Sequence, residues 1–252
     1  RLLDGQAHAE YSLSEAYLAM GQPALAHDYA LRCVRTSTQT KNVNWAMKAH
    51  MLLVLSEYYL GNMSEALDHA RQGAKLAESL QSWRNLAYIH LAEARVELAM
   101  GRIDAGWLHS QSAEEIGSAE KISRVLSWAA SHRGQTLRFL RQYPQAVEAY
   151  QAAAAHSQFT LDRLECQFRM GLAQAGAGQL EDGLSGLQAC LNAAQKAHLD
   201  FIELLAATAI LFIQVQNGML EQSRERLASL AERASGRGIA EGDCGIIFFV
   251  ND

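Results

Sequence analysis

Apolar residues recur at the three- and four-residue spacing of an α-helix along nearly the whole chain, and the alternation typical of β-strands is almost absent. A short punctuation interrupts this pattern at regular intervals. At each interruption an apolar helix ends, a Gly usually follows, and a small residue comes five positions later. The predicted turns are centred on Gly21, Gly61, Gly101, Arg141, Gly178 and Gly218, at intervals of 40, 40, 40, 37 and 40 residues. We therefore expect an array of about six helical hairpins.

The residues around each turn explain why a hairpin forms there. Gly suits the left-handed conformation that ends a helix. Both prolines, Pro23 and Pro144, fall where a second helix should begin, a position that tolerates Pro. The small residues five positions after each turn let two helices approach closely; they are Ala26, Ala66, Gly106, Ala146, Gly183 and Ser223. A single hairpin cannot bury its own apolar face, so neighbouring hairpins must stack.

These turns predict one repeat array over residues 1–236. The expected hairpins span residues 3–38, 43–80, 83–118, 122–157, 160–197 and 200–235. The interval of 37 residues lacks three residues near Ser157, in a loop between hairpins. A deletion at this place leaves the stacking intact. Residues 237–252 contain the apolar run Ile246–Val250, and we interpret this segment as an apolar tail or the start of a further repeat.

The chain resembles the tetratricopeptide-repeat (TPR) family at these residues. The Gly, the small residue five later, an apolar or aromatic residue nine later (Tyr150, Leu187) and a small residue twelve later match its motif. The repeat is longer than the usual 34 residues, and Arg141 replaces one Gly. The resemblance implies an all-α, right-handed TPR-like solenoid. Long repeats of this kind are similar to the sensor regions of bacterial signal-transduction ATPase regulators, including LuxR-type activators.

The resemblance also implies where a partner would bind. In the family, the first helix of each hairpin lines the concave face, with residues thirteen, ten, six and three before each turn in the groove. The aromatic, cationic and amide side chains that we select at these positions are Tyr58, Tyr88, Arg95, Trp128, Gln135, Arg138 and Phe168. Aromatic residues and Arg are typical of protein-binding hot spots. The alternative is that these rings pack between adjacent first helices.

Candidate chemistry adds little to this picture. His50 and His90 occupy matching positions, as do His69 and His109. Because equivalent residues of successive repeats lie about 8–10 Å apart, whereas a His–Zn bond is about 2 Å, we predict no metal site. The sequence also lacks a phosphate-binding glycine loop, a dinucleotide fingerprint and a nucleophile elbow. We therefore expect no catalytic residues and no cofactor, and do not expect an enzyme.

Composition limits which binding partners and which cellular compartment we expect for the chain. With 49% hydrophobic residues the chain should fold, and its net charge of −5 gives no electrostatic reason to bind nucleic acid. The longest apolar stretch, 204–213, is too short to span a membrane. Four widely scattered cysteines favour a reducing, cytoplasmic compartment over a disulfide scaffold.

These observations predict a non-catalytic, protein-interaction or regulatory module that presents a concave groove to a protein or peptide partner. The Arg-rich, Ala-rich composition and the start at Arg1 favour a piece of a larger bacterial regulator. The alternative is a sensor domain in which Arg95 and Arg138 pair with a small anionic effector. Self-association through the C-terminal end also stays open, because the first helix of the sixth hairpin is too apolar for a polar cap.

Overall fold

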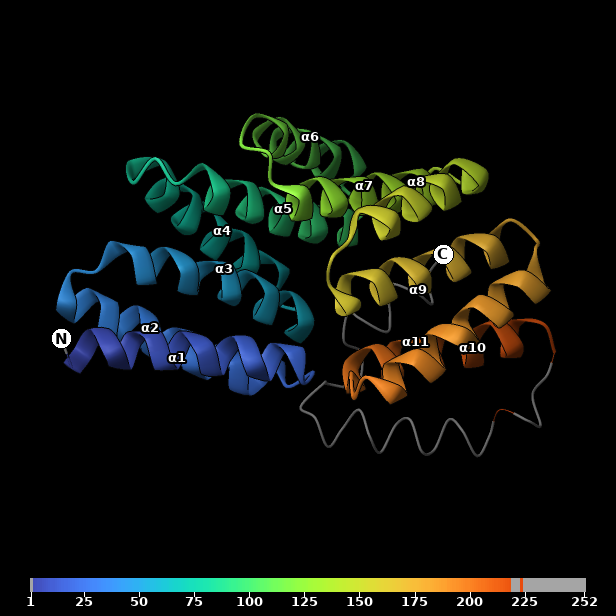
Figure 1. Cartoon of the computed structure of the whole chain (residues 1–252), viewed down its shortest axis with the longest axis horizontal. Coiled ribbons are helices and arrows are strands. Elements are labelled where there is room, and N and C mark those ends of the chain that lie inside the picture. Colours follow the sequence, from blue (N-terminus) through green and yellow to red (C-terminus); the bar gives the residue numbers. More distant parts are fainter. Residues whose placement is uncertain (1, 219–222, 224–252) are drawn as a thin grey trace. The chain divides into compact units, whose positions relative to one another are not determined.

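The computed structural model describes residues 2–218 and Ser223, and this part of the chain is a succession of α-helices without strands (Figure 1). The expected second helix of the sixth hairpin and residues 237–252 lie outside the described residues. The helices are α1 (Leu2–Ala19), α2 (Pro23–Thr40), α3 (Val43–Leu60), α4 (Met63–Ser79), α5 (Trp83–Ala99), α6 (Ile103–Ala119), α7 (Ser123–Phe139), α8 (Tyr143–His156), α9 (Thr160–Gly176), α10 (Leu180–Lys196) and α11 (Asp200–Gln216). The predicted all-α repeat architecture is confirmed. None of the described helices is long and apolar enough to cross a membrane.

Apart from the junction after α8, the turns between the described helices share one hydrogen-bonding pattern. At the turn between α3 and α4, Gly61 has a φ of 85°, and the Asn62 amide donates to the Glu57 carbonyl at 2.9 Å. This is the bond that closes a helix with a left-handed residue after its last turn. The turn between α4 and α5 has the same bond, from the Ser82 amide to the Ala77 carbonyl at 2.8 Å. Both kinds of turn, within and between hairpins, therefore reverse the chain in the same way.

The left-handed residue is not always Gly. Arg141 takes this role at the turn within the fourth hairpin, with a φ of 58°. The left-handed residues between hairpins are Lys41, Gln81, Lys121 and His198. The junction after α8 is different, because Ser157 is extended, with φ −78° and ψ 128°. This junction is where the repeat is three residues short, so the deletion replaces a left-handed turn with an extended link.

Small residues let the two helices of a hairpin lie in close contact. The residues five past the turn, such as Ala26 and Ala66, have no exposed surface. Farther along the hairpin, the Cys33 thiol donates to the Ala7 carbonyl at 3.2 Å. The Cys190 thiol makes the equivalent bond to the Leu164 carbonyl at 3.3 Å. A side chain twelve past the turn thus reaches the backbone of the first helix directly.

The chain divides into two compact units, the first ending at Val125 and the second beginning at Leu126. In the first unit α1 packs against α3 and α3 against α5, so the first helices of three hairpins form a row. In the second unit α9 packs against α11. The core of the second unit contains Phe168, Leu187 and Ile202.

Gly183 and Gly186 on α10 provide a test of this close packing. A Cβ on Gly183 would lie 2.7 Å from the Gly171 carbonyl oxygen and 2.8 Å from the Ala175 backbone nitrogen of α9. Gly183→Ala should therefore lower the free energy of unfolding by about 1–3 kcal/mol, although Ala has the higher helix propensity. Urea unfolding followed by circular dichroism would measure the change.

Gly186→Ala is the matched control. Its nearest neighbour would be the Gln174 side-chain oxygen at 3.5 Å, an ordinary contact. This substitution should leave stability unchanged or raise it by up to about 1 kcal/mol. Equal stability of the two variants would contradict the close approach of α9 and α10.

Candidate functional site

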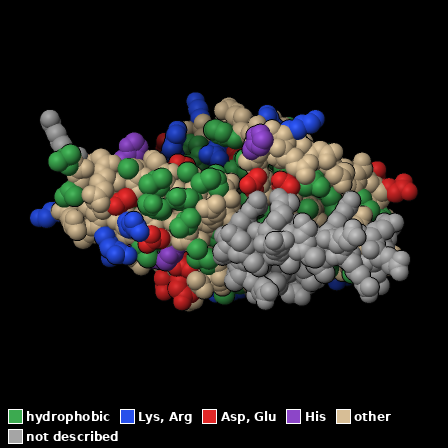
Figure 2. Space-filling view, turned by 90° about the horizontal axis from the view of Figure 1, so that it is seen from below, with side chains coloured by type: hydrophobic (Ala, Val, Ile, Leu, Met, Phe, Trp, Pro, Cys, Tyr) green, Lys and Arg blue, Asp and Glu red, His purple; other side chains and the backbone are tan. Residues whose placement is uncertain are grey.

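The row of first helices in the first unit carries the predicted groove positions. Figure 2 shows hydrophobic side chains gathered in groups on one face of this unit, among Lys, Arg, Asp and Glu. Two groups of aromatic and cationic side chains lie along the row: one joins α1 to α3, and the other joins α3 to α5.

The first group, which we call the Trp45 cluster, consists of His8, Tyr11, Trp45 and Lys48. His8 and Tyr11 come from α1, and Trp45 and Lys48 from α3. The His8 ring stacks on Trp45 with centroids 4.9 Å apart, and the Tyr11 ring lies 5.6 Å from Trp45. The Lys48 ammonium lies 4.6 Å from the Trp45 centroid and 5.9 Å from that of Tyr11. The cluster thus holds a cation against two aromatic rings.

The Trp45 cluster is accessible and carries positive charge. His8 is exposed, and the other three residues are half-buried. Within the described residues the Lys48 ammonium has no carboxylate in ion-pair contact. Burial, helped by the nearby Glu15 carboxylate, raises the pKa of Tyr11 to about 12. The Tyr11 hydroxyl therefore stays neutral near pH 7.

The second group contains two of the predicted residues, Tyr58 and Arg95. The Arg95 guanidinium donates to the Tyr59 hydroxyl at 3.0 Å and lies 6.0 Å from the Tyr58 ring centroid. The rings of Tyr58 and Tyr59 meet edge to face at 5.0 Å. Tyr58 and Arg95 are only 8% and 9% exposed, so little of either side chain is available to a partner. Tyr88, also predicted, is half-buried on α5.

The predicted residues of the second unit differ in exposure. Trp128 and Arg138 are half-buried on α7, and the Arg138 guanidinium lies 5.0 Å from the Phe139 ring. Gln135 is 5% exposed and accepts a hydrogen bond from Arg169 Nη1 at 2.9 Å. The sequence prediction did not include Arg169, which lies one residue after Phe168.

Phe168, also predicted at the groove, is buried. It is 1% exposed and packs among Leu187, Cys190 and Ile202 in the core of the second unit. The ring therefore stabilises the stacking of α9 on its neighbours. The alternative stated for these rings, packing between helices, describes Phe168.

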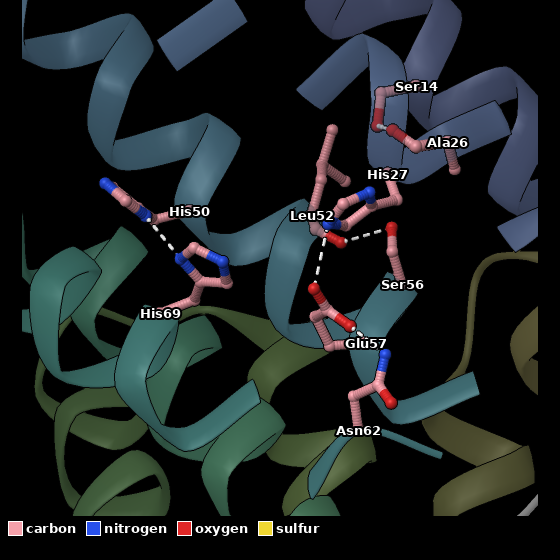
Figure 3. Close-up of polar contacts among 9 residues, drawn as sticks. All are labelled: Ser14, Ala26, His27, His50, Leu52, Ser56, Glu57, Asn62 and His69. Carbon is pink, nitrogen blue, oxygen red and sulfur yellow. Dashed lines mark hydrogen bonds and ion pairs between the residues drawn. The ribbon is translucent and has the colours of Figure 1, made fainter. Parts of the chain in front are cut away.

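A buried carboxylate that the prediction missed ties three helices together (Figure 3). Glu57 on α3 lies 2.8 Å from Nε2 of His27 on α2, and it accepts a hydrogen bond from the Asn62 side chain before α4 at 2.7 Å. Forty residues later, Glu97 repeats only the contact with the residue five positions on, with Arg102 Nε at 2.6 Å, and Leu67 stands at the position equivalent to His27. Comparing the residues four before each Gly turn would have revealed this pair of carboxylates.

Histidines form contacts within hairpins. Nδ1 of His50 on α3 lies 3.2 Å from Nδ1 of His69 on α4 (Figure 3). In the next hairpin, Nδ1 of His90 and Nδ1 of His109 lie 2.9 and 3.1 Å from the same oxygen of Glu93. We expected no metal site because histidines of successive repeats lie far apart, but the close histidine pairs join the two helices of one hairpin. Distances between repeats therefore do not decide whether these groups can bind a metal ion.

The two histidine pairs differ in electrostatics. Burial, with a smaller effect of His69, lowers the pKa of His50 to about 4. Burial also lowers the pKa of His69. Burial raises the pKa of the Glu93 carboxyl, but hydrogen bonds from His109 and His90 outweigh it and hold the pKa at about 2. The hydrogen bond to Glu93 in turn raises the pKa of His109.

Comparison with known proteins places this geometry in a fold class. No protein-family model and no curated protein matches the chain. Among solved structures, it is similar to a Rap protein complexed with competence and sporulation factor, with a TM-score of 0.70, 13% identity, and coverage of 97% of this chain and 72% of that one. It is also similar to aspartyl phosphate phosphatase F from Bacillus subtilis, with a TM-score of 0.65, 14% identity, and coverage of 92% and 60%.

A third similar structure is a signal-transduction ATPase with a tetratricopeptide-repeat sensor from Pyrococcus horikoshii. Its TM-score is 0.54 at 15% identity, with coverage of 91% of this chain and 36% of that one. The chain therefore spans a little over a third of that protein and 60% of the phosphatase. At sequence identities this low, the structural similarity shows the fold alone, and the chain has the TPR-like all-α repeat fold.

The buried His50 should make stability depend on pH. Its pKa is about 4 in the folded chain and 6.5 as the ordinary value, so below pH 6.5 the unfolded chain takes up a proton that the folded chain does not. The free energy of unfolding should therefore fall between pH 6.5 and 4, by up to about 3 kcal/mol from this group. Urea unfolding at several pH values in this window would measure the slope.

His50→Gln should reduce that slope, because Gln does not titrate. Comparing slopes removes any pH-independent cost of the substitution. Identical slopes for the wild type and His50→Gln would show that His50 is protonated equally in both states.

Proposed function

We propose that the chain is a protein-binding repeat module whose first unit holds an acidic peptide segment of a partner along the row α1, α3 and α5. The proposed anchor is the Trp45 cluster. The module has no catalytic step, and we propose that it works as part of a larger regulator by bringing the partner to it.

The observation that carries this proposal is the lysine of the cluster. Lys48 is held against Trp45 and Tyr11, and among the described residues it has no ion-pair partner. An Asp or Glu side chain, or a chain-terminal carboxylate, would neutralise it and gain a charge-assisted hydrogen bond. The adjacent half-buried rings would cover the apolar part of the peptide, as aromatic anchors do in hot spots.

We propose that some of the predicted groove residues contact the partner and that others support the binding surface. Tyr88 lies half-buried on α5 and would extend the surface beyond Lys48. We propose that Tyr58 and Arg95 support that surface by packing α3 against α5, since little of either side chain is exposed. Trp128 and Arg138, half-buried on α7, stay as proposed contacts of the second unit.

The fold comparisons support a binding role by analogy. The similar Rap protein is complexed with competence and sporulation factor, and the similar ATPase has a tetratricopeptide-repeat sensor. The alternative carried from the sequence, a small anionic effector, would use the same positive charge. Binding measurements with peptides and with small anions distinguish a peptide ligand from a small anionic effector.

Selection from a random peptide library on the whole chain tests the proposal. We expect enrichment of peptides with Asp or Glu, and we would measure their affinity by fluorescence anisotropy. Lys48→Met should weaken binding by about tenfold, or 1.4 kcal/mol. Trp45→Ala should cost about 2 kcal/mol or more, measured after circular dichroism shows that the variant is folded.

Lys196→Met is the matched control. Lys196 is exposed at the end of α10 in the second unit, and the substitution removes the same charge. It should leave the affinity unchanged. Selected peptides without acidic residues, or equal affinity of Lys48→Met and the wild type, would reject the proposal. Binding of inorganic phosphate or small carboxylates without any peptide would favour the effector.

A further inference from the structure

Three potential metal ligands converge in the third hairpin. His90 and Glu93 lie one turn apart on α5, and His109 faces them from α6. One oxygen of Glu93 lies 2.9 Å from Nδ1 of His90 and 3.1 Å from Nδ1 of His109. Ligand atoms of all three side chains lie within 4.8 Å of one another. We infer that this cluster binds a single divalent transition-metal ion of the zinc type.

The distances suit such an ion. Tetrahedral Zn²⁺ with bonds of about 2.0–2.1 Å has its ligand atoms roughly 3.3 Å apart. The two nitrogen–oxygen distances in the hairpin are close to this value, so small side-chain rotations would seat the ion between the three groups. Two imidazoles and one carboxylate form a ligand set that suits Zn²⁺. The carboxylate would also offset part of the charge of the ion.

The cluster combines one nearly buried ligand, Glu93, with one that solvent can reach, His109. The Glu93 side chain is nearly buried, which limits its rotation, whereas the His109 side chain is 32% exposed. An ion could enter from the His109 side, and solvent could complete the coordination. Both helices belong to one hairpin, whose turn bond from the Arg102 amide to the Glu97 carbonyl measures 2.9 Å. The hairpin therefore holds the ligands of α5 and α6 in register.

The preceding hairpin provides an internal comparison. His50 and His69 stand forty residues before His90 and His109, but Leu53 takes the place of Glu93. The chain thus contains the same histidine pair with and without a carboxylate. Because a Leu cannot coordinate a metal ion, the third hairpin offers three ligands at these positions and the second offers two. The metal site does not depend on the Trp45 cluster. If the chain binds acidic peptides but binds no metal ion, only the proposed metal site is overturned.

Isothermal titration of the whole chain with ZnCl₂ after EDTA treatment and desalting tests the site. We expect one ion per wild-type chain. His109→Gln should weaken binding about tenfold or more, since loss of even an outer-shell partner costs 10–100-fold. Its side chain is the most exposed of the three, so this variant should retain the fold. Glu93→Gln should weaken Zn²⁺ binding similarly, and His69→Gln, the equivalent substitution one repeat earlier, should not.

Cobalt provides a second readout that does not depend on heats. Co²⁺ bound to the wild-type chain should give visible absorption bands, which His109→Gln should lose and His69→Gln should keep. Absence of stoichiometric Zn²⁺ binding by the wild type would overturn the inference. Equal binding by His109→Gln and the wild type, or equal losses in His109→Gln and His69→Gln, would overturn it as well.

Discussion

The close contact between the two helices of each hairpin is the constraint on which the rest of the structure depends. Side chains five past the turn must be small, because at Gly183 even one methyl group would meet the backbone of α9. At this separation a thiol on the second helix can donate directly to a carbonyl of the first, as Cys33 does to Ala7. Larger residues at these places would push the helices apart and lose the packing of both apolar faces.

The same contact determines where functional groups can meet. A turn with a left-handed residue sets the register, so a residue eleven before it faces one eight after it. His50 and His69, like His90 and His109, meet in this way. The first helices meanwhile pack side by side, which brings Tyr11 of α1 to Trp45 of α3. Contacts within a hairpin thus create the histidine sites, and contacts between hairpins create the aromatic surface.

Much of the fold could be predicted because it depends on residues with a single structural use. Gly at a helix end and a small residue five later have few alternative explanations, and their spacing repeats. The turns between hairpins carry no such mark. Lys41 and Gln81 adopt a left-handed backbone conformation that their residue types do not predict. Their geometry follows from the packing of consecutive helices.

The site was harder to predict because spacing does not fix the rotation of a helix. Phe168 and Trp128 are both aromatic residues at expected groove positions, yet one is in the core and the other is half-buried. Lys48 also stands at a groove position, and only the neighbouring rings show how its charge is held. The sequence did not single out Glu93 as a possible metal ligand. Its two histidine partners lie three and sixteen residues away, and they meet Glu93 only where α5 packs against α6.

We propose that the row of first helices, and not the second-helix face, contacts the partner. Photo-crosslinking tests it most directly, with a benzophenone amino acid at His8 in one variant and at Leu108 in another. Both positions are exposed, His8 on α1 beside Trp45 and Leu108 on α6. With a bound acidic peptide, we expect crosslinks from position 8 and none above background from position 108. Crosslinks from position 108 alone would contradict it.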